Sequence, residues 1–390
     1  MSFRRVTFFT STRADYGLLK PLMAEVQSRH GMTAFNIVAG THLSKEHSET
    51  WREIAADGFS IDHKIEMPAD LLESDREAEF ASTVLLGVSE ALRRFRPDLI
   101  VLLGDRYELL SAAQAAVLAG VPIAHIHGGE TTEGAIDESI RHAITKLSYL
   151  HFAAAKNYAA RIQQMGESPD RIWTVGALAM DNIKRLKNLP LQYIETLVGI
   201  PIQSPSFLLT YHPETLEADR GESTLKILLE ELEKYMGSIV ITGVNVDPGA
   251  HNIREIFKNF AKRSVCRVGL VESLGVEGYL NAIKHVDVVV GNSSSGIIEA
   301  PAIGTPTIDV GLRQKGRLRA PSVIHCSRTA ESISHALELA LSPAHRKVTA
   351  CLKTPYGSPG VAKRIVDILQ TVEVVDLRKP FYSNDTHLMR

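Results

Sequence analysis

The chain has 390 residues, of which 44% are hydrophobic and 23% charged, with 43 basic against 45 acidic side chains. Because this length exceeds what one hydrophobic core usually supports, we expect two globular domains. A formal net charge of −2 argues against nucleic-acid and anionic-membrane partners, which need a basic surface, so any phosphate-binding site must be local.

The cysteines and the N-terminal segment indicate the compartment. Cys266, Cys326 and Cys351 are widely spaced and form no CxxC pair, which argues against a disulfide framework and a thiolate metal site. The apolar run near the N-terminus is too short for a signal peptide, and no stretch approaches 18 apolar residues. We therefore expect a cytoplasmic protein.

The first half of the chain alternates short apolar strands with amphipathic helices. Strands are predicted at 6–10, 35–39, 98–105 and 121–126, and helices at 16–26, 51–56, 85–95 and 109–118. Continuous apolar strands between such helices favour a parallel sheet covered on both faces, which is α/β architecture.

The pattern restarts after a proline-containing stretch at 188–206. Strands are predicted there at 207–210, 239–242, 286–290 and 307–310, and a helix at 361–374. We predict an N-terminal domain at 1–185, a similar second domain at 186–365, and a helix end and tail at 366–390. Because ligands bind beyond the carboxyl ends of parallel strands, loops of both domains facing each other would form an interdomain cleft.

The segment 288–300, VVVGNSSSGIIEA, predicts a strand that runs through a Gly/Ser turn into a helix. Backbone N–H groups and hydroxyls at a helix start suit a phosphate, although the serines could equally serve only as helix caps. Glu299 on the same helix could accept ribose hydroxyls. The chain lacks GxGxxG and GxxxxGK[ST], which argues against NAD and against a P-loop nucleotide site.

Two further loops carry candidate proton-transfer groups. In GDRYE (104–108), Asp105 could transfer a proton and Arg106 could neutralise a diphosphate, or the two could form an ion-paired helix start. The segment AHIHGGE (124–130) contains His125 and His127, a possible metal half-site, but no further ligand follows at a recognised spacing, so no metal is expected. Glu130 closes this segment.

A helix is predicted to begin near Asp137, with Arg141 one turn later. Asp105, Glu130 and Asp137 are carboxylates in neighbouring loops, and such groups can act as base and acid when their environments differ. The remaining candidates that follow predicted strands are Arg13, Arg106, Arg313 and His212. Each arginine alone could be an ordinary surface charge.

Six motifs together resemble the hydrolysing UDP-N-acetylglucosamine 2-epimerases, including bacterial sialic-acid pathway enzymes and the epimerase half of a bifunctional animal enzyme. They run in order from about residue 5 to residue 365: TRADYG (12–17), GDRYE (104–108), HGGE with GAIDESIRH (127–142), HPE (212–214), GNSSSG (291–296) and RQKGR (313–317). The resemblance implies a GT-B-like fold of two Rossmann-like domains with the nucleotide sugar between them, no cofactor, and a homodimer or homotetramer.

The resemblance also implies roles for individual residues. UDP would be held by Arg13, Asn245, Ser293, Ser294, Glu299 and Arg313; the sugar would be surrounded by Asp105, Glu130 and Asp137; and Arg106 and His212 would lie near the diphosphate or glycosidic oxygen. In the animal enzyme a carboxylate stands where this chain has His127, whereas some bacterial members also carry histidine. The acid–base duty of that position therefore belongs either to His127 or to Glu130 and Asp137.

The implied reaction is UDP-GlcNAc plus water to ManNAc and UDP, through anti elimination of UDP to a 2-acetamidoglucal and its hydration, for sialic acid synthesis. The same reaction on UDP-N,N'-diacetylbacillosamine, leading towards legionaminic acid, is the alternative. A non-hydrolysing epimerase, a GT-B glycosyltransferase and a non-catalytic UDP-sugar sensor are remoter alternatives, since fold alone does not decide between them. The familiar HVEAG and PEE patterns of the non-hydrolysing enzymes are absent.

Overall fold

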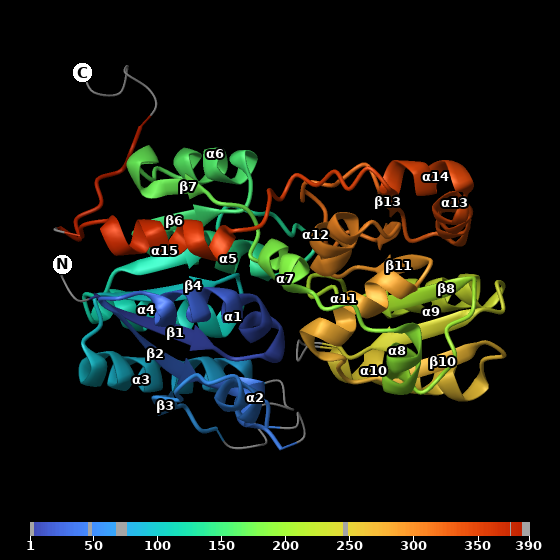
Figure 1. Cartoon of the computed structure of the whole chain (residues 1–390), viewed down its shortest axis with the longest axis horizontal. Coiled ribbons are helices and arrows are strands. Elements are labelled where there is room, and N and C mark those ends of the chain that lie inside the picture. Colours follow the sequence, from blue (N-terminus) through green and yellow to red (C-terminus); the bar gives the residue numbers. More distant parts are fainter. Residues whose placement is uncertain (1–3, 46–48, 68–75, 245–248, 375, 384–390) are drawn as a thin grey trace. The chain divides into compact units, whose positions relative to one another are not determined.

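The computed structural model describes residues 4–45, 49–67, 76–244, 249–374 and 376–383, and it divides into two compact units (Figure 1). Among these residues the first unit extends to Glu130, resumes from Asp137 to Asp181 and again from Gly357, and the second holds Thr131–Ile136 and Asn182–Tyr356. Each unit contains one parallel sheet with helices packed on it, so the predicted α/β fold class is confirmed.

The first unit is built on a seven-stranded sheet in the order β3-β2-β1-β4-β5-β6-β7, in which neighbouring strands are parallel. Its strands are β1 (Arg4–Thr10), β2 (Met32–Val38), β3 (His63–Lys64), β4 (Leu99–Leu103), β5 (Ile123–Ile126), β6 (Leu150–Ala153) and β7 (Ile172–Thr174). Its helices are α1 (Arg13–Ser28), α2 (Trp51–Ala56), α3 (Glu77–Phe95), α4 (Tyr107–Leu118), α5 (Asp137–Leu147), α6 (Lys156–Gln164) and α15 (Val361–Thr371), with 3₁₀ turns at Gly40–Leu43 and Pro169–Arg171.

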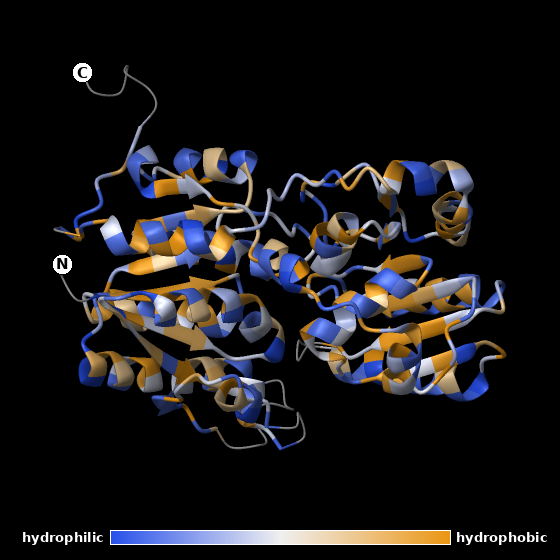
Figure 2. Ribbon diagram, in the orientation of Figure 1, coloured by the Kyte–Doolittle hydropathy of each residue, from blue (hydrophilic) through white to orange (hydrophobic). Residues whose placement is uncertain are grey.

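Local chemistry sets several of these boundaries. Thr12 and Asp15 form a reciprocal capping box that begins α1. Helix α3 ends where Arg96 adopts a left-handed conformation before Pro97, which disfavours helix at the residue that precedes it. All five residues of β4 are buried, as expected for a central strand covered on both faces. Figure 2 shows the same contrast, with hydrophobic strands and helices of mixed polarity.

The second unit is built on a six-stranded parallel sheet in the order β10-β9-β8-β11-β12-β13. Its strands are β8 (Ser206–Thr210), β9 (Ser238–Thr242), β10 (Arg267–Val271), β11 (Val288–Gly291), β12 (Thr307–Val310) and β13 (Val323–Cys326). Its helices are α8 (Leu191–Val198), α9 (Glu222–Glu233), α10 (Ala250–Arg263), α11 (Gly275–His285), α12 (Ser294–Ile303), α13 (Ala330–Leu341) and α14 (Pro343–Thr349). Helix α7 (Ala179–Arg185) carries the chain from the first unit into the second.

The division differs from the predicted domain ends at 185 and 365, because the chain returns to the first unit. Helix α15 packs against α1, and Arg29 of α1 pairs with Asp367 at 2.6 Å. The carboxylate of Asp181 accepts the N–H groups of Val361 at 3.1 Å and Ala362 at 2.7 Å, which caps the start of α15. The C-terminal helix therefore belongs to the first unit.

Some elements are absent from the sequence-based prediction. The proline-containing stretch 188–206 includes α8, whose Ile194 and Val198 are buried in a hydrophobic cluster of the second unit. Strands β3, β6, β7 and β13 have two to four residues each, and β10 (Arg267–Val271, RVGLV) has its first and fourth residues exposed. Such short strands carry little periodic signal, and neighbouring strands in the sheet stabilise them.

Candidate functional site

The candidate residues follow the strands at which the strand order of each sheet reverses. In the first sheet, β1 has β2 on one side and β4 on the other; in the second, β8 lies between β9 and β11. Open parallel sheets bind ligands beyond the carboxyl ends of strands at such switch points. Arg13 follows β1 and Asp105 follows β4, while His212 follows β8 and Ser293 follows β11.

In the first unit, the guanidinium of Arg141 connects two of the predicted carboxylate residues. It contacts the Asp105 carboxylate, donates to the Glu130 carbonyl at 3.1 Å, and pairs with Glu138 at 2.9 Å. Arg141 is 1% exposed, whereas the Asp105 side chain is 21% exposed. A buried cation therefore holds Asp105 at the end of β4 while leaving part of its carboxylate open to solvent.

His127 and Glu130 lie on one turn and contact each other. His127 Nδ1 is 2.8 Å from Glu130 Oε1, and Leu178 N donates to His127 Nε2 at 3.4 Å. His127 has a φ of +67°, which is uncommon for a residue other than glycine and occurs often at functional sites. A Cβ on Gly129 would lie 2.4 Å from Tyr158 O, so the turn requires glycine there.

His125 has a different environment, although it is only two residues from His127. It is fully buried in β5, and its Nε2 donates to Gly104 O at 2.8 Å, directly before Asp105. Burial lowers the pKa of His125 to about 3, so the ring is neutral. His125 is thus a buried support for the loop after β4. Among the residues that the structure describes, no group of three or more His, Cys, Asp or Glu is placed to hold a metal ion.

The two predicted arginines of the first unit have carboxylate partners. Arg13 lies in the first turn of α1 and pairs with Glu53 at 2.9 Å, with a 36% exposed side chain. Arg106 donates from Nε to Glu108 at 2.7 Å, and Glu108 also accepts the Ser11 hydroxyl at 2.8 Å. Glu108 is buried and links the loops after β1 and β4. Asp137, the first residue of α5, is partly buried.

In the second unit, the helix predicted after the Gly/Ser turn is confirmed; it begins at Ser294, and the preceding Ser293 is its cap. The Ser293 hydroxyl accepts Ser295 N at 3.4 Å, and the Ser295 hydroxyl donates to Ser293 Oγ at 3.2 Å. Tyr279 of α11 contacts the Ser295 hydroxyl in turn. Helix capping by serine is therefore present, and it leaves the helix dipole directed at the space beyond β11.

Arg313 and His212 are brought together with this turn through Asn292. Arg313 Nη1 donates to Asn292 O at 3.3 Å, and the backbone N–H of His212 donates to Asn292 Oδ1 at 2.7 Å. Arg313 is 8% exposed and His212 is 6% exposed. The loops after β8, β11 and β12 therefore form one hydrogen-bonded group.

Glu299 lies on α12, one and a half turns beyond its first residue. Burial raises the pKa of Glu299 to about 7, so its charge changes near neutral pH. The same environment raises the pKa of Tyr279 to about 12. Asn245, the remaining predicted UDP ligand, lies outside the described residues.

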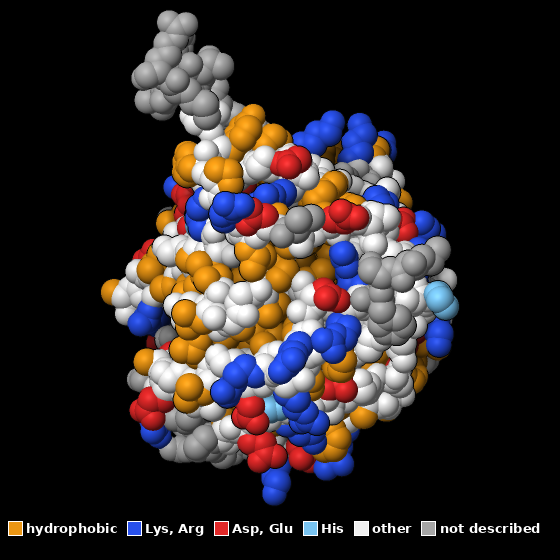
Figure 3. Space-filling model, turned by 90° about the vertical axis from the view of Figure 1, so that its left-hand side faces the viewer, with side chains coloured by type: hydrophobic (Ala, Val, Ile, Leu, Met, Phe, Trp, Pro, Cys, Tyr) orange, Lys and Arg blue, Asp and Glu red, His pale blue; other side chains and the backbone are white. Residues whose placement is uncertain are grey.

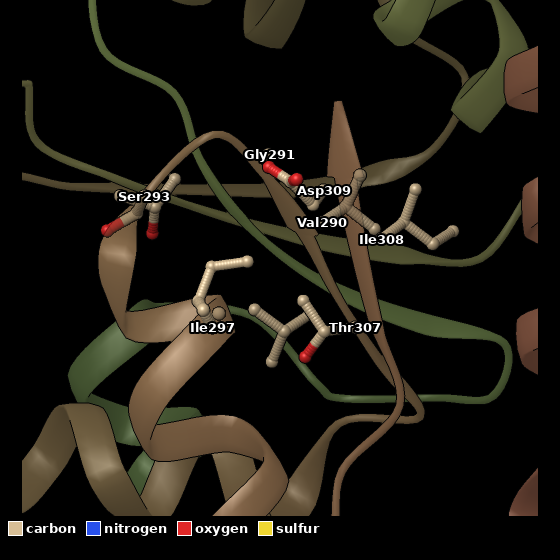
Figure 4. Close-up of a pocket in the computed structure, with 10 residues that line it drawn as sticks. Val290, Gly291, Ser293, Ile297, Thr307, Ile308 and Asp309 are labelled. Carbon is tan, nitrogen blue, oxygen red and sulfur yellow. The ribbon is translucent and has the colours of Figure 1, made fainter. Parts of the chain in front are cut away.

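A small pocket lies under the Gly/Ser turn (Figure 4). Ser293 borders it, and Ile297 of α12 faces Thr307 of β12 across it. At its polar side, Asp309 is buried and pairs with Arg319 at 2.7 Å and His325 at 3.1 Å. Valine, isoleucine and glycine make up over half of the lining, and the hydroxyl of the lining that lies on the turn is that of Ser293.

The family is decided by a comparison with known sequence families, in which residues 24–370 match the UDP-N-acetylglucosamine 2-epimerases. The chain belongs to this family. Among similar proteins, the GDP/UDP-N,N'-diacetylbacillosamine 2-epimerase (hydrolyzing) of Campylobacter jejuni is 37% identical over 83% of this chain and 84% of its own length. The UDP-N,N'-diacetylbacillosamine 2-epimerase (hydrolyzing) of Legionella pneumophila is 33% identical over 95% and 96%. The UDP-N-acetylglucosamine 2-epimerase of Neisseria meningitidis serogroup B is 31% identical over 87% and 88%.

Solved structures of this family share the fold. The UDP-GlcNAc 2-epimerase of Neisseria meningitidis bound to UDP-GlcNAc matches with a TM-score of 0.81 at 20% identity, covering 94% of this chain and all of that one. Family membership confirms the resemblance identified from the motifs and the expectation of an enzyme. No helix in the described part of the chain is long and apolar enough to cross a membrane.

Three buried residues of the site are not among the residues predicted from the sequence: Glu108 at the start of α4, Arg141 in α5 and Asn292 after β11. Glu108 and Asn292 stand inside the motifs GDRYE and GNSSSG, whose neighbouring residues carry the more familiar phosphate and proton-transfer chemistry. Arg141 follows Asp137 by one helical turn, a spacing that by itself indicates only a local ion pair. The signal that could have found it is a charged residue between apolar helix positions, since a fully buried arginine needs anionic partners.

Proposed function

We propose that the chain is a hydrolysing epimerase that converts UDP-N,N'-diacetylbacillosamine and water into 2,4-diacetamido-2,4,6-trideoxymannose and UDP. The observation that carries this proposal is that two relatives, matched over most of their lengths, are named for this sugar: the 33% identical one for its UDP-linked form and the 37% identical one for its GDP- or UDP-linked form. UDP-GlcNAc, converted to ManNAc, is the second candidate, supported by the 31% identical relative from Neisseria meningitidis serogroup B.

The proposed chemistry starts from the anomeric bond. The C2 hydrogen of a 2-acetamido sugar has no adjacent carbonyl, so it becomes acidic only when the C1–O bond breaks and C1 gains positive character. A base then removes the C2 proton, which leaves a glycal and UDP. Protonation of C2 from the opposite face, with addition of water at C1, gives the epimeric free sugar.

We assign the proton transfers to the first unit. Asp105 is the proposed base, because Arg141 fixes a carboxylate that stays partly exposed at the end of β4. Glu130, His127 and Asp137 are the remaining candidates for the acid that delivers a proton to the opposite face. We propose that His127 and Glu130 share this duty, because His127 Nδ1 lies 2.8 Å from Glu130 Oε1.

We assign UDP to the second unit. The start of α12 at Ser293 and Ser294, together with Arg313, would stabilise the departing diphosphate, and Glu299 would accept the ribose hydroxyls. His212 would lie beside the diphosphate or the glycosidic oxygen. Arg13 and Arg106 of the first unit would add positive charge, for which Arg106 must exchange its contact with Glu108 for one with the substrate.

The deciding experiment is incubation of the purified protein with each nucleotide sugar separately, followed by identification of the sugar and nucleotide products. A higher kcat/KM for UDP-N,N'-diacetylbacillosamine, with UDP and a 2-epimeric free sugar as products, is expected. Preference for UDP-GlcNAc would select the second candidate, and an epimer still attached to UDP would indicate a non-hydrolysing enzyme. Turnover unchanged by exhaustive chelation and without nicotinamide is part of the proposal.

We also propose a homo-oligomeric, cytoplasmic enzyme. One face of the molecule carries a broad patch of exposed hydrophobic side chains (Figure 3). In the first unit, Val117 and Leu118 at the end of α4 are exposed, and so is Leu377, which lies next to Gly120. Exposed apolar patches of this kind favour association. The three free cysteines fit a reducing compartment.

A further inference from the structure

The side chain of Asn292, directly after β11, makes hydrogen bonds with both the N–H and the carbonyl group of His212. Its side-chain Oδ1 accepts the His212 N–H at 2.7 Å, and its side-chain Nδ2 donates to the His212 carbonyl at 2.8 Å. Asn292 is fully buried. Parallel pairing of Gly291 with Thr210 places the ends of β11 and β8 side by side, which brings the two residues within reach.

The main chain of Asn292 is hydrogen-bonded to the loop after β12, which carries Arg313 and Gln314. Its carbonyl oxygen accepts Arg313 Nη1 at 3.3 Å and Gln314 Nε2 at 2.9 Å, and its N–H donates to Thr210 O at 3.2 Å. Ser293, the cap of α12, is the next residue. One buried residue thus joins His212, the start of α12 and the loop that carries Arg313.

We propose that Asn292 is the positioning residue that sets His212 against the diphosphate end of the substrate. The inference rests on the proposed function, in which His212 and the start of α12 both act on the departing UDP. A primary amide offers a donor and an acceptor on one short planar group at every pH, so asparagine satisfies both backbone groups of His212 at this spacing without depending on protonation. Loss of either bond frees the His212 loop while the cap at Ser293 stays in place.

Substitution Asn292→Asp tests this arrangement through pH. A protonated carboxyl group offers one O–H donor and one carbonyl acceptor, and so reproduces both bonds of the amide. An ionised carboxylate accepts the His212 N–H but repels the His212 carbonyl. Burial favours the protonated form of the introduced carboxyl group. Positive charge on its neighbours Arg313 and His212 favours the ionised form, so the pH at which the carboxyl group ionises is taken from the measured pH profile of kcat.

Asn281 provides a matched control in the same unit. It is equally buried, and its side-chain amide also accepts one backbone hydrogen bond and donates another. Oδ1 accepts the N–H of Leu189 at 3.0 Å, and Nδ2 donates to Lys187 O at 2.9 Å. It lies in α11 and holds the connection before α8. Asn281→Asp therefore disturbs stability in the same chemical way without touching the His212 loop.

The experiment measures kcat, KM and UDP affinity of both variants against wild type between pH 5 and pH 8.5. For Asn292→Asp we expect kcat to fall roughly tenfold or more at high pH, since an unsatisfied buried group has an effect of that order. The ratio to wild type should recover towards 1 at low pH, with UDP affinity nearly unchanged throughout. For Asn281→Asp the ratio should stay flat. A flat ratio for Asn292→Asp, or equal profiles for the two variants, overturns the proposal.

A second readout does not depend on turnover. The ring ¹H–¹⁵N signals of His212, assigned by comparison with His212→Gln, are recorded in the UDP complex. They should shift in Asn292→Asp at high pH and not in Asn281→Asp; unchanged signals overturn the proposal even if neither nucleotide sugar is a substrate. If Asn292→Asp does not fold, Asn292→Ser, which keeps one hydrogen bond, should lower kcat with UDP affinity retained, and an unchanged kcat overturns the proposal.

Discussion

The buried guanidinium of Arg141 gives the sharpest stability prediction. In Arg141→Met the side chain keeps its length and packing but loses the contacts with Asp105, Glu138 and the Glu130 carbonyl. Both carboxylates then lose their cationic partner. Removing one member of a buried ion pair typically lowers the free energy of unfolding by about 3–5 kcal/mol, because a charge is left uncompensated.

The structure favours the lower end of that range. The side chains of Asp105 and Glu138 are 21% and 23% exposed, so water can hydrate them after the guanidinium is removed. We expect a loss of about 3 kcal/mol. With a urea dependence of about 2–3 kcal/mol per molar, the unfolding midpoint of the first unit should fall by about 1 M.

Tryptophan fluorescence measures this unit selectively. The chain has two tryptophans, Trp51 and Trp173, and both belong to the first unit. Trp173 stacks on Phe152 with ring centroids 5.6 Å apart, a contact that is lost on unfolding. A urea titration followed by fluorescence therefore reports the first unit, even if the two units unfold separately.

Arg378→Met is the matched control, because Arg378 pairs with Asp376 but is 90% exposed. Such surface pairs contribute about 0–1 kcal/mol, so the midpoint should barely move. In the double variant Arg141→Met with Asp105→Asn, the combined loss should be smaller than the sum of the two single losses, because one of the two carboxylates that lose Arg141 is no longer charged. If Arg141→Met shifts the midpoint no more than Arg378→Met, the reasoning about this buried contact is wrong.

Three further predictions concern catalysis. Asp105→Asn should lower kcat by about 10²–10⁴-fold with UDP affinity preserved, whereas Arg313→Ala should mainly weaken UDP binding; calorimetry that finds the reverse would show the roles exchanged. Because burial raises the pKa of Glu299 to about 7 and ribose hydroxyls donate to the ionised form, UDP affinity should rise as pH increases through 7 more steeply in wild type than in Glu299→Gln, and equal slopes would refute this. Product formed in D₂O should carry deuterium at C2, and early samples from H₂¹⁸O should carry label at C1 and none in UDP; hydrogen retained at C2 would exclude the glycal.

Glu299 also links pH to stability. Its folded pKa lies above the usual value of 4.5, so the folded state binds the proton more tightly than the unfolded chain. Stability of the second unit is therefore greatest below about pH 4.5 with respect to this group, and it decreases as pH rises towards 7. This cost at neutral pH is consistent with a residue kept for binding and not for stability.

Local patterns were sufficient to predict the α/β class of both units. The predicted helix at 51–56 coincides with α2, and the predicted strand at 307–310 coincides with β12. Continuous apolar strands separated by amphipathic helices leave few alternatives to a covered parallel sheet. The same topology requires loops that follow strands to lie at one edge, which is why motif residues such as Asp105 and Ser293 could be recognised as site candidates from sequence alone.

The partners of those residues depend on tertiary structure. Arg141 reaches Asp105, 36 positions earlier in the chain, because β4 and β5 are neighbours and α5 follows them. Asn292 reaches His212, 80 positions earlier, because β11 pairs with β8. Sequence periodicity reports which face of an element is buried, and it carries no information on which distant element lies against that face. Strand order decides that, and with it which buried polar groups find partners.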